Sequence, residues 1–269
     1  MRTMNSIRTY LAFLLMLLST GSLAWAQGLS MSPTRLFFSG NPGEVQSQTV
    51  TLHNASSSDY TFSLHYKDWE RQEDGDKVYF NPGTLKTSNA AWMSTALNAV
   101  TVPAGTSREV VVTMRIPKQA AGTEVTNSML FFTQLPKQEE VTSSARQGLG
   151  IITLFELGLH LYNTPPANTR TNVEITAMQF NAADRTVEVA FENEGNTVLD
   201  ATVEFELTNK ATGAELKLPA VPVSLLPGTL QKTVFTFDQA PKGDYLGVAL
   251  IRMAGSNDLR VGEKDLVLP

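Results

Sequence analysis

The chain has 269 residues, of which 42% are hydrophobic and 17% are charged, with a formal net charge of −5. This apolar fraction is too high for a disordered chain, and the acidic balance excludes the global basic character typical of nucleic-acid-binding proteins. Cysteine is absent, which excludes disulfides, thiolate metal sites and a cysteine nucleophile.

The first segment, residues 1–26, has the features of a secretory signal peptide. Arg2 and Arg8 accompany an apolar run at residues 10–18, and Ala-Trp-Ala at residues 24–26 fits the small-x-small pattern of a cleavage site. The alternative is an uncleaved membrane anchor, for which the apolar run is short. We therefore expect an exported protein, and export without disulfides favours a bacterial periplasm.

The region up to residue 164 has the pattern of short β-strands. Alternating apolar and polar residues, rich in β-branched and aromatic types, occur at residues 45–53, 60–66 and 110–116. Turn motifs rich in Asn, Asp, Gly and Pro separate the strands, at residues 41–43, 74–76, 81–83 and 103–105. We predict a first β domain over residues 27–164.

A second set of strands follows a linker that contains Pro165 and Pro166. Further strand patterns occur at residues 173–180, 186–192, 201–207, 231–237 and 245–251. Many short strands without intervening helices favour an all-β chain of two Ig-like antiparallel β-sandwich domains, 27–164 and 165–269. The absence of cysteine shows that neither is an antibody-type domain.

Motifs for catalysis or metal binding are missing from the sequence. It contains no G-x-S-x-G, H-E-x-x-H or P-loop pattern, and its three histidines, His53, His65 and His160, lie within strand patterns. The acid-rich residues 68–76 lack the ladder of a calcium loop and are better explained as a polar hairpin tip. We expect no enzymatic activity, no cofactor and no metal; a hydrolase or sugar-binding β protein is the weakest of the alternatives.

Arg35 stands in an otherwise apolar strand pattern, residues 32–38, with the sequence Ser-Pro-Thr-Arg-Leu-Phe-Phe. An arginine in such a strand commonly faces solvent. Alternatively it is an anion anchor, because a guanidinium can hold a carboxylate bidentately and more strongly where water is partly excluded.

Residues 149–162 form the second unusual segment. The half up to Phe155 is apolar on both faces of the expected strand, whereas the other half has a single apolar face. One explanation is a central strand that is covered on both sides. The other is a strand edge that offers hydrophobic residues to another chain.

Together these features resemble the PapD-like periplasmic chaperones of pilus assembly. The local matches are Pro-Thr-Arg-Leu-Phe at residues 33–37 and the strand at residues 157–162, followed by Pro165. The resemblance implies two Ig-like domains that meet in an L shape. It also implies that the last strand of the first domain completes an unfinished pilus subunit, called donor-strand complementation, while a basic pair anchors the subunit's C-terminal carboxylate.

By this resemblance Arg35 would be one anchor, and the donor residues would be Ile151, Thr153, Phe155, Leu157 and Leu159. The implied partners are secreted pilus or fimbrial subunits, with an outer-membrane usher as a further one.

One part of the family pattern is absent. The family's second anchor is a lysine on the last strand of the first domain, but no Lys or Arg occurs between Arg146 and Arg170. Glu156 and His160 take the polar positions of that strand, and Glu156 could pair with Arg35. The alternative function is therefore a structural or adhesive Ig-like module of the cell envelope.

Overall fold

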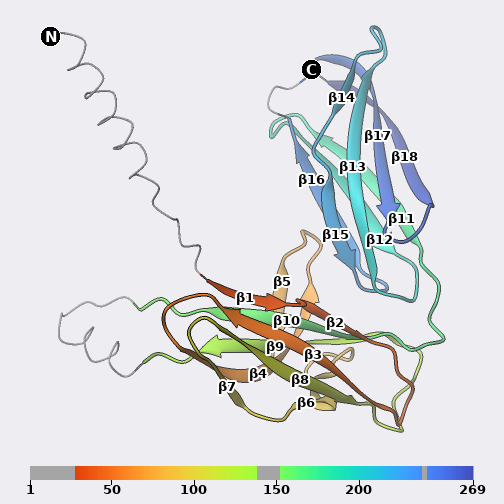
Figure 1. Cartoon of the computed structure of the whole chain (residues 1–269). Coiled ribbons are helices and arrows are strands. Elements are labelled where there is room, and N and C mark those ends of the chain that lie inside the picture. Colours follow the sequence, from red (N-terminus) through yellow and green to blue (C-terminus); the bar gives the residue numbers. More distant parts are fainter. Residues whose placement is uncertain (1–27, 138–151, 238–240, 269) are drawn as a thin grey trace, which may run out of the picture.

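The computed structural model describes residues 28–137, 152–237 and 241–268, and Figure 1 shows them as two groups of strands set at an angle in an L shape. The predicted signal peptide and the predicted donor residue Ile151 lie outside the described residues. Each sheet draws its strands from one side only of the connection between Asn163 and Val173. The protein is therefore an all-β chain of two Ig-like β-sandwich domains.

The first domain consists of two facing sheets. One has the order β1-β3-β8-β6, and the other has the order β2-β10-β9-β4-β5 with β7 also on β4. The bounds in the first sheet are β1 Leu29–Ser32, β3 Val45–Asn54, β6 Met93–Thr95 and β8 Thr106–Arg115. Those in the second are β2 Arg35–Phe38, β4 Tyr60–Arg71, β5 Lys77–Phe80, β7 Ala99–Val102, β9 Thr126–Gln134 and β10 Glu156–Asn163. A short 3-10 helix, η1 Ala90–Trp92, leads into β6.

The first two strands of the described residues, β1 and β2, belong to different sheets. β1 pairs antiparallel with β3, and after the cis bond between Ser32 and Pro33 the next strand, β2, runs parallel to the second half of β10. This parallel pair departs from the antiparallel sheets that the sequence predicted, because the chain passes from one sheet to the other without reversing. The passage places Arg35 opposite His160.

Alternation along the strands builds the core of the first domain. In β8, Val110, Val112 and Met114 are buried, whereas Val111 between them is 48% exposed. Each such side chain contributes roughly 1.5–3 kcal/mol by leaving water, so the period-2 pattern fixes which face of the strand turns inward.

The second domain repeats this construction with strands of its own. Its smaller sheet has the order β11-β12-β16, and the larger has the order β14-β13-β17-β18 with β15 on β13. The bounds are β11 Val173–Asn181, β12 Thr186–Asn193, β13 Leu199–Asn209, β14 Glu215–Lys217, β15 Val221–Leu225, β16 Leu230–Thr236, β17 Gly243–Met253 and β18 Leu259–Leu268. One hydrophobic cluster, centred on Phe191, Phe205 and Phe237, fills the space between the two sheets.

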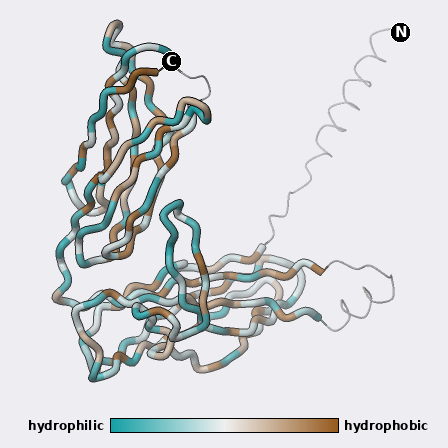
Figure 2. The backbone as a smooth tube through the Cα atoms, turned by 180° about the vertical axis from the view of Figure 1, so that it is seen from behind, coloured by the Kyte–Doolittle hydropathy of each residue, from teal (hydrophilic) through white to brown (hydrophobic). Residues whose placement is uncertain are grey.

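The hairpin formed by β4 and β5 connects the two domains from the side opposite the linker. In Figure 2 it rises from the first domain toward the second and is hydrophilic near its tip. The backbone N–H of Lys232, in β16, donates a 2.5 Å hydrogen bond to the carbonyl of Glu73, and the Lys232 Nζ lies 3.1 Å from the Glu73 carboxylate. The hairpin therefore bounds one side of the space between the domains.

Candidate binding site at the domain junction and along β10

Arg35 reaches the space between the domains because of its position in β2. Leu36 and Phe38 are buried in the core of the first domain, so Arg35 and Phe37 face away from that core. The guanidinium carbon of Arg35 lies 5.4 Å from the centre of the Phe37 ring, and Phe37 in turn stacks on Tyr162 of β10 at 5.1 Å. An aromatic support of this kind limits the orientations that the arginine can adopt.

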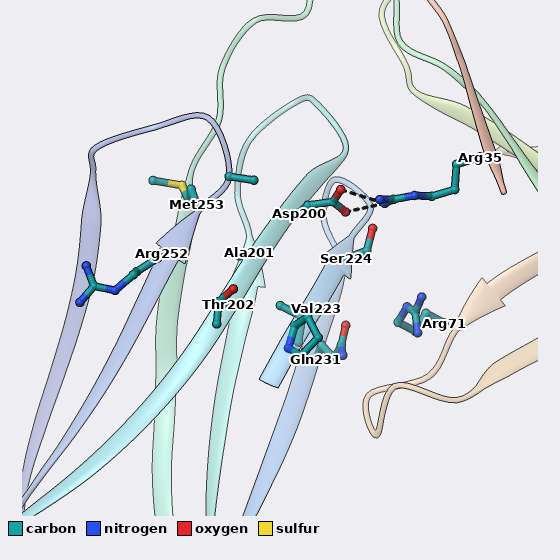
Figure 3. Close-up of a pocket in the computed structure, with 12 residues that line it drawn as sticks. Arg35, Arg71, Asp200, Ala201, Thr202, Val223, Ser224, Gln231, Arg252 and Met253 are labelled. Carbon is teal, nitrogen blue, oxygen red and sulfur yellow. Dashed lines mark hydrogen bonds and ion pairs between the residues drawn. The ribbon is translucent and has the colours of Figure 1, made fainter. Parts of the chain in front are cut away.

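The Arg35 side chain holds a carboxylate from the other domain. Its Nη1 donates hydrogen bonds to both carboxylate oxygens of Asp200, in β13, at 2.7 and 2.8 Å (Figure 3). This hydrogen bond raises the pKa of the Arg35 guanidinium, while partial burial acts in the opposite direction. The expected alternative partner, Glu156, instead accepts a hydrogen bond from the Thr133 hydroxyl at 2.6 Å. The pairing of Glu156 with Arg35 was therefore wrong, because the angle between the domains brings Asp200 to the arginine.

The residue opposite Arg35 in the sheet is His160, whose ring is in contact with the side chain of a lysine. The Nζ of Lys77, the first residue of β5, lies 2.9 Å from the His160 Nε2. Burial, reinforced by Lys77 and two arginines, lowers the pKa of His160 to about 3. The imidazole is therefore neutral at ordinary pH, and its Nε2 accepts a hydrogen bond from the lysine.

Arg71 is a further cation at this junction, at the end of β4. Its guanidinium donates a 2.6 Å hydrogen bond to the carbonyl of Gly75 and lies 5.8 Å from the Trp69 ring. Together with Arg35 it lines a cavity of about 540 Å³ between the domains, to which Asp200 and Ser224 of the second domain also contribute (Figure 3).

Sequence reasoning did not find Arg71 or Lys77. Arg71 lies within the acid-rich residues 68–76 that were interpreted as a polar hairpin tip, and Lys77 directly follows them, so no local pattern distinguishes either from a solvated hairpin residue. The pairing of β5 with β4 brings Lys77 to His160 of β10, and this contact is visible only in the folded structure.

An apolar cluster lies beneath these cations. Trp69 and Tyr162 are buried there, and Val198 and Leu226 of the second domain pack against the cluster. Burial raises the pKa of Tyr162 to about 12, so its hydroxyl stays neutral. Water is thus partly excluded below the cationic groups, a setting in which hydrogen bonds between ions are stronger.

β10 leads away from this junction with one edge left open. Over its whole length it pairs with β9, but β2 pairs only with its last four residues, His160–Asn163. Within β10, residues 156–159 therefore have backbone partners on one side only, and the carbonyl of Phe155, just before the strand, accepts a hydrogen bond from the Gln134 N–H. An unpaired edge of this kind can accept a strand from another chain.

The predicted donor residues lie along this open segment, with different degrees of burial. Thr153 is exposed, and Phe155 and Leu157 are half-buried against the core of the first domain. Leu159 is fully buried in that core and has no surface to offer in this conformation. The neighbouring Leu154, which was not among the predicted donors, is 41% exposed.

The described residues hold no group of three or more His, Asp or Glu side chains arranged to bind a metal ion. No helix among them has the length and the apolar character needed to cross a membrane.

No family model and no curated protein matches this sequence. Solved structures do match. They include a class 5 fimbriae chaperone, CfaA, at 12% identity, with 88% of this chain and 98% of that chain covered and a TM-score of 0.49. A chaperone–tip adhesin complex of CFA/I fimbriae matches at 12% identity, with 90% and 99% coverage and the same TM-score. They also include the CsuC–CsuE chaperone complex of Acinetobacter baumannii, at 12% identity, 87% and 97% coverage and a TM-score of 0.48. The CupB2 chaperone of Pseudomonas aeruginosa matches at 13% identity, 89% and 100% coverage and a TM-score of 0.46. The chain is thus similar in structure to several fimbrial chaperones at low sequence identity.

Proposed function

We propose that this protein is a periplasmic chaperone that binds secreted pilus- or fimbria-type subunits by donating an edge strand. Residues 1–26 would direct its export, and the domains would divide at residue 165 as the sequence predicts. The observation that carries the proposal is the open edge of residues 156–159 of β10, which ends next to Arg35, itself bound to a carboxylate, and which residues 152–155 would prolong.

The geometry supplies two complementary kinds of recognition. Residues 152–159 would extend over about 26 Å at 3.3 Å per residue, which is enough for one partner strand. Backbone hydrogen bonds along this edge are independent of the partner's sequence, while the side chains of Phe155 and Leu157 add apolar contact. A carboxylate at Arg35 would fix the register of the partner strand.

The mechanism needs no nucleotide and no metal. Each apolar side chain that becomes fully buried in the partner contributes roughly 1.5–3 kcal/mol, against which the cost of ordering the two strands must be set. Release would require only that another strand compete for the same groove of the subunit. An outer-membrane usher would be the place where that exchange occurs.

The test begins with capture of subunits from the periplasm and their identification by mass spectrometry, followed by co-expression of the recovered subunit. We expect the double substitution Phe155→Glu with Leu157→Glu to abolish co-purification, because two charges would enter the contact. Val267→Glu is the matched control, since Val267 lies in β18 and is 78% exposed. Undiminished capture by the double variant would contradict the proposal and favour a structural or adhesive module.

A second pair of variants separates the contribution of the backbone hydrogen bonds from that of the side chain. Leu154→Pro removes a backbone N–H beside the open edge, whereas Leu154→Ala shortens the side chain and keeps the N–H. We expect the proline variant to lose subunit binding and the alanine variant to retain most of it. Circular dichroism would establish that both variants are folded.

A further inference from the structure

A second cavity lies between the domains, beside the linker. Its volume is about 390 Å³, within the range of small-molecule sites, which occur preferentially where domains meet. The first domain lines it with the loops that contain Lys86 and Glu124, the linker with Asn168, and the second domain with the turns that contain Asn196 and Leu226. No residue lines both this cavity and the one that contains Arg35 and Asp200, so the two are separate sites.

Two opposite charges stand at this cavity without partners. The side chains of Lys86 and Glu124 are exposed, and among the described residues neither makes a hydrogen bond or an ion pair, with the other or with a third group. Both also line a neighbouring cavity of about 160 Å³, so both border open space. A ligand that carries one positive and one negative group could therefore bind both charges without breaking an existing contact.

Asn127 adds an uncharged acceptor to the same wall. Its side chain is buried, and its Nδ2 donates a 2.9 Å hydrogen bond to the carbonyl of Trp69, which fixes the orientation of the amide. The Asn127 Oδ1 is buried too and accepts no hydrogen bond from the described residues. A buried oxygen without a donor costs free energy, which an N–H group of a ligand would recover.

The loop that carries Lys86 is held in place from below. The carboxylate of Asp68, in β4, is fully buried and accepts hydrogen bonds from the Leu85 N–H at 2.9 Å and from the Ser88 hydroxyl at 2.5 Å. These two bonds fix the backbone on both sides of Lys86. A wall that is fixed before the ligand arrives reduces the entropy that binding costs.

The far side of the cavity is fixed by the linker and contains apolar surface. The Nδ2 of Asn168 donates to the carbonyl of Thr123 at 2.9 Å and to that of Asn196 at 2.8 Å, one from each domain. Val125 of the first domain and Leu226 of the second also line the cavity. The site thus combines two free charges, a free amide oxygen and apolar surface.

We propose that this cavity binds a short peptide whose two termini are free. The peptide's ammonium group, which has three donors, bonds to the Glu124 carboxylate and to the Asn127 Oδ1. Its terminal carboxylate pairs with Lys86, and an apolar side chain packs on Leu226 and Val125. Because Lys86 and Glu124 do not contact each other, two or three residues span them better than a single amino acid does. None of these residues belongs to the open edge of β10, so the inference does not depend on strand donation.

The test uses the tripeptide Ala-Leu-Ala in four forms: with both termini free, with the N-terminus acetylated, with the C-terminus amidated, and with both termini blocked. Binding to the full mature chain is measured by isothermal titration calorimetry. We expect the free tripeptide to bind, and each blocked terminus to weaken binding about tenfold, as expected for loss of a charge-assisted contact.

Two variants assign each terminus to its residue. In Lys86→Met the amidated peptide should bind as well as the acid, while acetylation still weakens binding. In Glu124→Gln the effect of acetylation should shrink severalfold, while the effect of the amide remains. The matched controls are Lys217→Met and Glu109→Gln, which change exposed charges outside the cavity and should leave all four affinities unchanged. A free tripeptide that does not bind the wild-type chain, or a preference for free termini that survives in both cavity variants, would overturn the inference.

Discussion

His160 shows how the environment of a single residue decides its chemistry. It takes one of the polar positions of the strand that carries a lysine in the family pattern, yet it is uncharged at ordinary pH. Its ring stands edge-on to Trp69 at 4.7 Å and stacks on Tyr162 at 5.9 Å, while Lys77 contacts its Nε2. The positive charge next to His160 thus comes from a residue 83 positions earlier in the chain.

The shifted pKa of His160 predicts how stability depends on pH. In the folded chain the pKa is about 3, against 6.5 for the ordinary group, so between these values the unfolded state binds more protons. The free energy of unfolding should therefore fall as the pH decreases from about 6.5 to about 3, by roughly 2–5 kcal/mol from this residue. His160→Gln should remove this component, although it lowers stability at neutral pH by losing the ring contacts.

Urea unfolding of the wild-type chain and the His160→Gln variant from pH 3.5 to pH 7.5 checks this expectation. Carboxylates also titrate in part of this range, so the informative quantity is the difference between the two curves. The difference should shrink steadily toward low pH. Curves that remain parallel would mean that His160 has an ordinary pKa in the folded protein.

At the scale of the elements, local pattern predicted most of the longer strands. The alternation at residues 45–53 and 110–116 corresponds to β3 and β8, and the pattern at residues 201–207 lies within β13. β9 was missed because it is buried on both faces, so its sequence, Thr-Asn-Ser-Met-Leu-Phe-Phe-Thr-Gln, has no alternation to detect. A strand in the middle of a sheet loses the signal on which such predictions depend.

The candidate site could be predicted only in part, for a related reason. Arg35 stood out because a charge in an apolar strand is locally unusual, and its role as an anchor for a ligand stays a prediction. Its contact with Asp200 joins residues 165 positions apart, and it depends on the angle between two domains. Short-range pattern contains no information about that angle, and the same holds for the position of Lys77 on His160.

Gly75, at the tip of the hairpin between β4 and β5, and Gly83, in the loop after β5, should differ in how much stability the chain loses when alanine replaces them. Gly75 and Gly83 both have positive φ angles, of 93° and 81°, so alanine at either position is strained by roughly 1–2 kcal/mol. A Cβ at Gly75 would in addition lie 3.3 Å from the Nε2 of Gln231 in the second domain, whereas nothing lies within 4 Å at Gly83. Gly75→Ala should therefore lower stability more than Gly83→Ala.

Tryptophan fluorescence during urea unfolding measures this difference, because the two described tryptophans, Trp69 and Trp92, both belong to the first domain. We expect the midpoint to fall in both variants, with the larger decrease in Gly75→Ala. Equal decreases would show that the hairpin tip does not press on the second domain.

At the scale of the whole molecule, polar contacts, apolar packing and the linker hold the angle between the domains. The polar contacts are the pair of Arg35 with Asp200 and the contact of Glu73 with Lys232, all partly exposed to water. The apolar packing is that of Val198 and Leu226 on the cluster around Trp69 and Tyr162. In the linker, the side chain of Asn168 donates hydrogen bonds to the carbonyls of Thr123 and Asn196, one from each domain.

These contacts differ in strength, which predicts how the angle responds to mutation. An exposed ion pair contributes at most about 1 kcal/mol, so Asp200→Asn alone should widen the range of angles without separating the domains. Adding Leu226→Ala removes apolar contact that water does not replace, and should widen the range further.

The cysteine-free sequence makes this motion directly measurable. Spin labels on cysteines introduced at Leu97 in the first domain and Val267 in the second, which are 66% and 78% exposed, report the distance between the domains by pulsed electron paramagnetic resonance. We expect the distance distribution to broaden in Asp200→Asn and to broaden more in the double variant. Asp265→Asn, which breaks an ion pair with Lys210 inside the second domain, should leave it unchanged. If Asp200→Asn has the same distribution as the wild-type chain, the ion pair of Arg35 does not restrain the angle, and the apolar cluster and the linker hold the domains without it.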